Sequence, residues 1–178
     1  MNTKTKPFRG LHLWELALLA GLAAVLLTGA LSLGEQTALS EKVVRLHVLA
    51  NSDSQEDQAL KLRVRDQVLA ETETLLESST DRNEAERRLT AALPELERLA
   101  AEEITESGYD YTVSVRLEET AFPTRTYDGF TLPAGEYLAL RVLIGAAEGQ
   151  NWWCVVFPPL CAGASEDVAE TALAAGLS

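Results

Sequence analysis

The sequence predicts an α+β domain, a two-layer sandwich in which two long helices cover one face of a mixed or mainly antiparallel sheet. Three observations predict this class: an apolar strand pattern early in the chain, two helical stripes after it, and alternating strand patterns near the end. The order is one strand, two helices and four further strands, joined by short links. A transmembrane or signal helix is predicted to precede the domain.

The N-terminal segment, residues 1–40, differs chemically from the rest of the chain. Lys4, Lys6 and Arg9 precede an apolar run, residues 16–33, that carries no charged side chain. As a helix, these 18 residues span about 27 Å, close to the thickness of the hydrocarbon core of a bilayer. The positive flank predicts a cytoplasmic N-terminus and export of everything that follows the run.

The sequence leaves the fate of this helix open. Small residues at 30–32 and 38–40 offer cleavage sites for a signal peptidase, which predicts a secreted domain. The run is longer than the usual signal-peptide core, which favours a retained membrane anchor. A buried core helix is disfavoured, because the run has no polar face and has cationic flanks.

The exported part, residues 41–178, is strongly acidic. Two of the 27 acidic and three of the 15 basic side chains lie in the N-terminal segment, which leaves 25 against 12 and a net charge of −13. No basic patch with interleaved aromatic residues is present, so a nucleic acid is not an expected partner. We expect one exported domain over residues 41–161, followed by an Ala-rich tail, residues 162–178, that is loose or weakly docked.

The domain opens with a strand and a helix. Residues 42–50 are nearly continuous in apolar side chains, as in a central strand that is covered on both faces. Leu60, Val64 and Val68 then recur every four residues and predict a helix with one buried stripe.

A second helix is predicted to start at Asp81, because Glu84 follows it at capping-box spacing. Pro94 lies inside its apolar stripe and should kink the helix or start a new one. Gly108 has the position of a residue that ends a helix.

The remaining elements are strands. Residues 109–118 alternate between apolar and polar side chains, which is typical of a strand with one buried face. A turn-rich segment follows, with a short edge strand expected at residues 124–127. Residues 136–145 form another strand, and residues 152–157 are expected to return antiparallel to it as a hairpin.

The polar segment LANSDSQED, residues 49–57, has the pattern of a joint between a strand and a helix. Asp53 with Glu56 has capping-box spacing, and Ser54 with Asp57 offers the same spacing one residue later. Early carboxylates also suit the positive end of a helix dipole. Asn51 precedes either cap, so we expect Asn51→Ala to leave the melting temperature nearly unchanged.

No pattern typical of a metal site or a catalytic site is present. A calcium loop needs a glycine, and none lies between Gly34 and Gly108. Zinc needs a cluster of histidine and cysteine, and His47 is the only histidine after residue 40. An exported hydrolase using His47 with Ser52 or a nearby acidic residue is the alternative hypothesis, although no GxSxG elbow is present. We therefore expect no cofactor, no metal and no small-molecule substrate.

The second unusual segment is NWWCVVFPPLC, residues 151–161. Adjacent Trp152 and Trp153 must point to opposite faces of a strand, so only one of them can enter a single-sided core. The other is covered within the fold or faces a partner, since exposed tryptophans often mark binding surfaces. Pro158 and Pro159 are expected to end the strand.

Cys154 and Cys161 flank the two prolines. In an exported domain, an even number of cysteines favours a disulfide, worth about 2–3 kcal/mol on a loop-entropy estimate. In the cytosol the same residues would be buried free thiols.

Several segments together resemble one known family. They are RLHVLANSDSQEDQALKLRVRDQVL, GYDY, FPTRTYDGFTLPAGEYLALRVLIG and NWWCVVFPPLC, which lie in this order within residues 42–161. They are similar to the stage II sporulation protein R family of endospore-forming bacteria. The resemblance implies a signalling protein that is made in the forespore and exported into the intermembrane space. There it would activate a membrane-embedded aspartic protease of the mother cell, which cleaves the precursor of sigma factor E.

The resemblance carries over no catalytic residue, because the chemistry belongs to the protease. The matching motif positions are candidates for the receptor-facing surface: Asn51, Ser52, Asp53, Trp152, Trp153, Pro158 and Pro159. The environment of His47 separates the two hypotheses. An open cleft converging on His47 favours the hydrolase, and a buried His47 beneath an aromatic surface favours the ligand.

Overall fold

The computed structural model describes residues 12–127 and 130–160. The chain divides into two compact units, Met1–Thr37 and Ala38–Ser178. The predicted apolar run lies in helix α1, Leu13–Ser40.

A search of the described residues for membrane-spanning segments finds no helix with the required length and apolar character.

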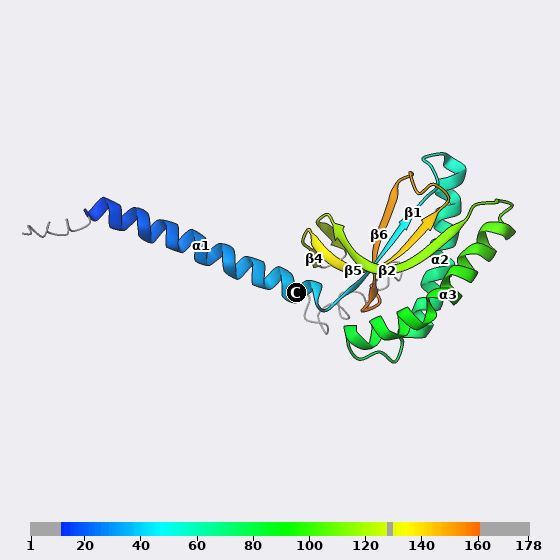
Figure 1. The fold of residues 1–178 in the computed structure, drawn as a ribbon, viewed down its shortest axis with the longest axis horizontal. Helices are drawn as coiled ribbons and strands as arrows, with labels where there is room; N and C mark the ends of the chain where they lie inside the picture. Colours follow the sequence, from blue (N-terminus) through cyan, green and yellow to red (C-terminus); the bar gives the residue numbers. More distant parts are fainter. Residues whose placement is uncertain (1–11, 128–129, 161–178) are drawn as a thin grey trace, which may run out of the picture. The chain divides into compact units, whose positions relative to one another are not determined.

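The second unit is an α+β domain, as predicted. Helices α2 and α3 lie on one face of its main sheet (Figure 1). Its elements, in chain order, are β1 Val44–Leu49, α2 Gln55–Leu76, α3 Arg82–Glu106, β2 Val113–Phe122, β3 Arg125–Tyr127, β4 Phe130–Leu132, β5 Gly135–Ile144 and β6 Asn151–Phe157.

The main sheet has four strands in the order β2-β5-β1-β6. β1 lies in the interior of the sheet, parallel to β5 on one side and antiparallel to β6 on the other. β2 pairs antiparallel with β5 and forms one edge. The sheet is therefore mixed, and β1 is the central strand that its apolar sequence predicted.

The predicted hairpin between β5 and β6 is wrong. β6 pairs antiparallel with β1, which lies between β5 and β6. Because β1 and β5 are parallel, both end at the same edge of the sheet, and the β5–β6 connection, residues 145–150, crosses the end of β1. A short link favours pairing between neighbours in the chain. Here β1, the first strand of the domain, lies between β5 and β6.

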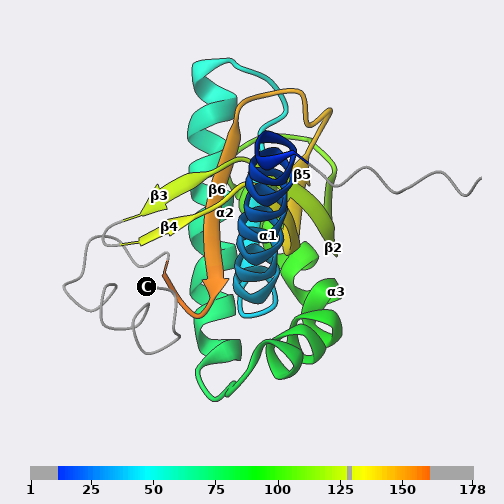
Figure 2. The same ribbon diagram turned by 90° about the vertical axis from the view of Figure 1, so that its left-hand side faces the viewer.

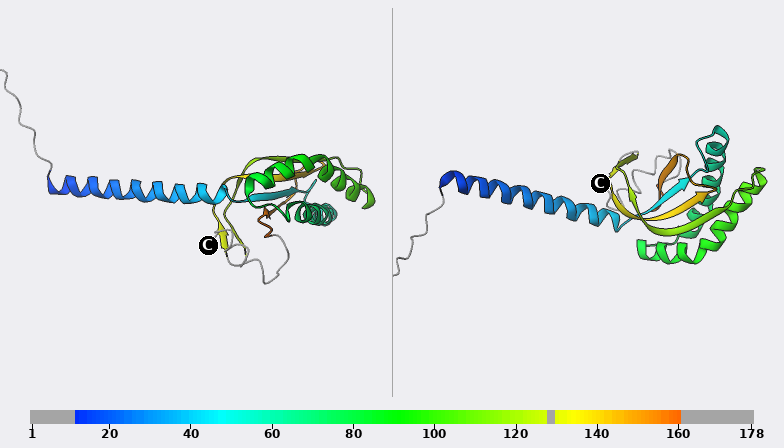
Figure 3. Two further views of the ribbon diagram at one scale, coloured as in Figure 1. Left: turned by 90° about the horizontal axis from the view of Figure 1, so that it is seen from below. Right: turned by 45° about the horizontal axis from the view of Figure 1, so that its top comes forward.

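β3 is a strand, as expected for residues 124–127, but it does not belong to the main sheet. It pairs antiparallel with β4 in a separate two-stranded sheet. This small sheet extends beyond the ends of β2 and β5 (Figure 3).

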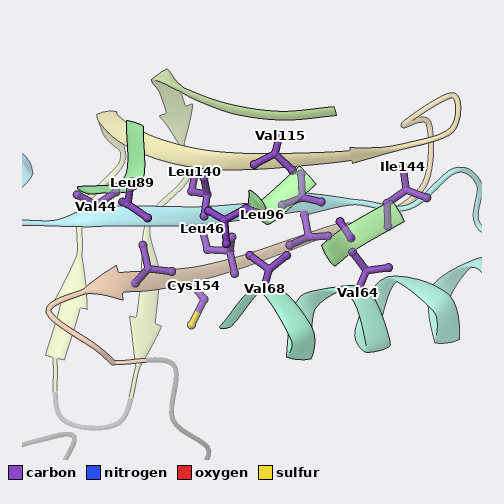
Figure 4. Close-up of a cluster of buried hydrophobic side chains, with 14 of the residues drawn as sticks. Val44, Leu46, Val64, Val68, Leu89, Leu96, Val115, Leu140, Ile144 and Cys154 are labelled. Atoms are coloured by element: carbon purple, nitrogen blue, oxygen red, sulfur yellow. The ribbon is translucent and has the colours of Figure 1, made fainter. Parts of the chain in front are cut away.

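The larger hydrophobic cluster lies between the main sheet and the two helices (Figure 4). The strands contribute alternate side chains to it, and the helices contribute side chains spaced about four residues apart. Among its members are Leu46, Val64, Val68, Leu89 and Leu140. The helical stripe predicted from the sequence is thus the buried face of α2.

A smaller cluster, rich in aromatic side chains, covers the opposite face of the sheet. Its buried members are Val43, Phe122, Phe130, Leu132, Tyr137, Ala139, Val155 and Leu160. The β3–β4 pair contributes to this cluster, so the strands β1 and β5 are covered on both faces. The predicted two-layer sandwich included the helices on one face and not the β3–β4 pair on the other.

Both helices begin at predicted cap residues, and the structure decides between the two caps that were predicted for α2. Asp81 caps α3 and accepts a hydrogen bond from the Glu84 backbone N–H, with an N···O distance of 2.9 Å. The cap of α2 is Ser54, which accepts from the Asp57 N–H at 3.1 Å. Asp53 is therefore not the cap.

Helix α3 continues through Pro94. The alternative that a new helix starts there is wrong. The helix ends before Gly108, whose φ of 82° is the left-handed conformation that glycine adopts at low cost.

The contact between the crossing connection and the end of β1 leads to a stability prediction. A Cβ added at Gly149 would lie 2.2 Å from the Ser52 carbonyl oxygen and 2.9 Å from Ala50 Cβ. Since a backbone atom blocks the space, Gly149→Ala should lower the free energy of unfolding by about 1–3 kcal/mol. Gly135→Ala is the control, because its Cβ would meet only Tyr137 Cε2, at 3.6 Å. Equal denaturant midpoints for the two variants would contradict this packing.

Candidate functional site

The segment LANSDSQED forms the loop from β1 into α2 and binds the crossing connection. Asn51 Oδ1 accepts a hydrogen bond from the Ala146 backbone N–H at 2.9 Å, and Asn51 Nδ2 donates to Asp57 Oδ2 at 2.9 Å. The Ser52 hydroxyl donates to the same Asp57 oxygen at 2.6 Å. One buried carboxylate therefore organises the loop.

Asp57 is ionised inside this loop for a clear physical reason. Burial by itself would raise the pKa of this carboxyl group. Hydrogen bonds from Ser52, Asn51 and Tyr111 outweigh that effect, and the pKa lies below its ordinary value. The charge of Asp57 is thus balanced by donors that belong to the fold.

The next residues bind the far end of the crossing connection. Asp53 Oδ1 accepts from the Gln150 backbone N–H at 2.7 Å, and Lys61 Nζ donates to the Gln150 carbonyl at 3.0 Å. The candidate residues Asn51, Ser52 and Asp53 therefore all serve the fold. The expectation that Asn51→Ala leaves stability nearly unchanged is not supported, because both polar atoms of its amide are bonded.

His47 lies on the sheet face opposite the helices and is only 4% exposed. Its ring stacks on Trp153, with ring centroids 3.8 Å apart and planes 13° apart. Its Nε2 lies 2.6 Å from Asn151 Oδ1. Burial lowers the pKa of His47 to about 4, against the opposing hydrogen bond to Asn151 and with a further lowering by the charge of Arg141. The imidazole is therefore neutral at pH 7.

The described residues do not assemble the hypothetical hydrolase site. The ring nitrogen Nε2 of His47 bonds Asn151, while the hydroxyl of Ser52 bonds Asp57. His47 Nδ1 is buried without a hydrogen-bond partner. Across residues 12–127 and 130–160, no group of three His, Cys, Asp or Glu side chains is placed to hold a metal ion.

Trp152 and Trp153 point to opposite faces of β6, as predicted. Trp152 is 37% exposed, and the Arg65 guanidinium lies over its ring at 4.2 Å from the centroid. Trp153 packs against His47 and Phe122 on the other face. The Trp153 ring therefore contributes mainly to packing within the fold, and the Trp152 ring lies at the surface.

A groove of about 260 Å³ lies between β3 and the start of β6. Figure 2 labels these two strands. Its lining residues come from two separate segments: Arg125, Thr126, Tyr127, Asn151, Trp152 and Trp153. β6 is an edge strand, and no other strand of the described chain pairs with its outer side. Arg125 and Tyr127 were not among the predicted site residues, because no local sequence pattern places β3 beside β6.

The remaining candidates lie elsewhere. Pro158 and Pro159 line a separate cavity of about 540 Å³, together with Phe157, Leu76 and residues of the turn between α2 and α3. The seven candidate residues therefore fall into three places, namely the loop after β1, the groove, and this cavity beyond the end of β6. The groove and the cavity each combine predicted candidates with residues that were not predicted.

The predicted disulfide remains a prediction. Cys154 is buried on β6, and the described part of the chain contains no free cysteine. Its proposed partner, Cys161, and the tail, residues 162–178, lie outside the described residues.

Fold and site together define an α+β domain with an aromatic groove at a sheet edge. His47 and Ser52 of this domain are hydrogen-bonded to other side chains of the fold. The family model described as stage II sporulation protein R (spore_II_R) matches residues 40–167. The stage II sporulation protein R of Bacillus subtilis (strain 168) is 40% identical to this chain over 127 residues. The chain belongs to the stage II sporulation protein R family and is a sporulation protein.

The match covers 71% of this chain and 57% of the Bacillus subtilis protein, so this chain spans little more than half of that relative. No solved structure matches the chain.

Buried His47 makes the stability of the domain depend on pH. Its pKa falls from an ordinary value of 6.5 to about 4, so between these values the unfolded chain binds a proton that the folded protein does not. Proton binding by the unfolded chain therefore lowers the free energy of unfolding. The decrease is absent above about pH 6.5 and grows as the pH falls, to about 3 kcal/mol near pH 4.

Denaturant titrations of the wild type and of His47→Gln at several pH values check this effect, because glutamine does not titrate. The wild type should lose stability relative to His47→Gln as the pH falls from about 6.5 to 4. A difference between the two proteins that stays constant over this interval would show that His47 takes up its proton equally well in the folded state.

Proposed function

We propose that this protein is an exported sporulation signal that activates a membrane-embedded aspartic protease of the mother cell. Activation leads to cleavage of the precursor of sigma factor E. Membership of the stage II sporulation protein R family supports a sporulation role. The observation that carries the choice of a ligand over an enzyme is the burial of His47 beneath Trp153.

A ligand role is supported by the way the polar side chains are used. A general base has to reach the proton that it abstracts, directly or through one water. His47 can meet a substrate only if the stacked Trp153 ring moves away, and its low pKa makes it a weak base. The Ser52 hydroxyl is engaged by Asp57. The proposed division of labour leaves the proteolytic chemistry to the partner.

The proposed location is the space between the forespore and mother-cell membranes. Support comes from the order of charges in the N-terminal segment, where Lys4, Lys6 and Arg9 precede the apolar run 16–33. This run would serve as a membrane anchor or as a cleaved signal. The net charge of −13 after residue 40 suits neither a nucleic acid nor an anionic lipid surface as the partner.

The N-terminal segment, residues 1–40, should be needed for delivery and not for activation, because its apolar run has no polar face for recognition. Residues 41–178 behind an unrelated signal peptide, co-expressed with the protease and the sigma factor E precursor, should give as much cleavage as the full chain. Immunoblots of the precursor measure this.

The matched control is the same fragment without a signal peptide, which should give no cleavage. An exported and folded fragment that stays silent, beside an active full chain, would mean that the first helix takes part in signalling. A full chain that is exported, folded and silent would instead remove the proposed function.

A further inference from the structure

Arg45, in the central strand β1, is a buried charge without a counter-ion among the described residues. It is 0% exposed, and its guanidinium lies over the rings of Phe122 and Tyr137, at 4.0 and 4.8 Å from their centroids. Nη2 donates to the Tyr127 hydroxyl at 2.8 Å, while the buried Nε and Nη1 find no hydrogen-bond acceptor in the described structure. Burying a cation without a paired anion is costly.

A second cation lies at the same place. Arg125 is exposed in the groove, two residues before Tyr127. Burial lowers the pKa of Arg45, and the nearby charge of Arg125 lowers it as well. Neither arginine has a carboxylate partner in the described part of the chain, whereas Arg65, on the other side of β6, pairs with Asp66.

Two neighbouring cations without an anion are unexpected in a domain with a net charge of −13. Most of the described arginines do pair with acidic side chains, so carboxylates are not scarce. A guanidinium matches a carboxylate in both charge and geometry. No carboxylate of the described residues fills this place, so the chemistry of the cluster selects a carboxylate ligand.

The shape of the groove selects an extended peptide. One wall is the start of the edge strand β6, and alternate residues of an edge strand direct their N–H and C=O groups away from the sheet. Such an edge can accept a further strand. Tyr127 and Arg125 are also of the residue types that dominate binding energy in protein interfaces, whereas the Trp152 ring lies on the other face of β6, beneath Arg65.

We propose that the groove between β3 and β6 binds an extended acidic segment of the partner protein, which lies along the start of β6 and places a carboxylate on Arg125. This inference rests on the proposed function, because the partner is the membrane-embedded protease. The carboxylate supplies the negative charge that the described residues around Arg45, Tyr127 and Arg125 do not provide.

Charge reversal at Arg125 tests the inference. Arg125 is exposed and makes no ion pair in the described structure, so Arg125→Glu should keep the fold and lower precursor cleavage by about tenfold or more. The control is Arg87→Glu on α3, which changes an arginine that is also exposed and makes no ion pair in the described structure, and it should stay within about twofold of wild type. Arg125→Gln repeats the test without adding a negative charge.

Secreted amount and melting temperature are measured for each variant, so that a folding defect is seen separately from a binding defect. Substitutions of Asp or Glu by Lys in the external segments of the protease are then screened with Arg125→Glu. One of them should restore cleavage with Arg125→Glu and weaken it with the wild-type chain.

The outcomes separate the two proposals. An active wild type with Arg125→Glu and Arg125→Gln as active as Arg87→Glu overturns the groove as the binding surface and leaves the proposed function standing. A folded, exported and silent wild type overturns both. Loss of activity in Arg125→Glu and Arg125→Gln alone, with restoration by a protease charge change, supports both.

Discussion

The arrangement of the domain depends on the hydrogen bonds that the loop after β1 makes to the β5–β6 connection. That connection crosses the end of β1, and four of its backbone N–H groups, which are strong donors, find their acceptors outside the sheet. The side chains of Asn51 and Asp53 and the carbonyls of Ala50 and Asn51 provide them. The four donors are the N–H groups of Ala146, Glu148, Gly149 and Gln150.

This constraint also positions the proposed binding surface. β6 begins directly after the connection, so the loop after β1 determines where Trp152 and Trp153 lie. Trp153 then covers His47, and the start of β6 becomes one wall of the groove that β3 completes. A polar loop whose sequence has the pattern of a strand-to-helix joint therefore supports the proposed recognition indirectly, by holding the edge strand in place.

Features with a local cause could be predicted from the sequence. The four-residue spacing of Leu60, Val64 and Val68 marks a buried helical face, and the adjacency of Trp152 and Trp153 forces them onto opposite faces. The strand order could not be predicted, because the parallel pairing of β1 with β5 depends on packing between residues far apart in the chain. For the same reason, the hydrogen bond from the Ala146 N–H to Asn51 could not be predicted, and the sequence showed only that Asn51 precedes the helix cap.

The groove was missed for a related reason, since β3 and the start of β6 meet only in the folded chain. One signal was present in the sequence, because Arg45 interrupts an otherwise apolar strand. A charged residue inside a strand that is buried on both faces requires a partner. Its hydrogen-bond partner, the Tyr127 hydroxyl, is neutral, so no side chain in the described part of the chain balances the charge.

Native-state hydrogen exchange of the β5–β6 connection tests most directly whether the loop after β1 holds the fold together. The amides of Ala146, Gly149 and Gln150 are predicted to exchange only through global unfolding, with the same opening free energy as amides in the centre of β1. Exchange of these three amides at rates typical of an unprotected surface loop, while β1 stays protected, would contradict the account.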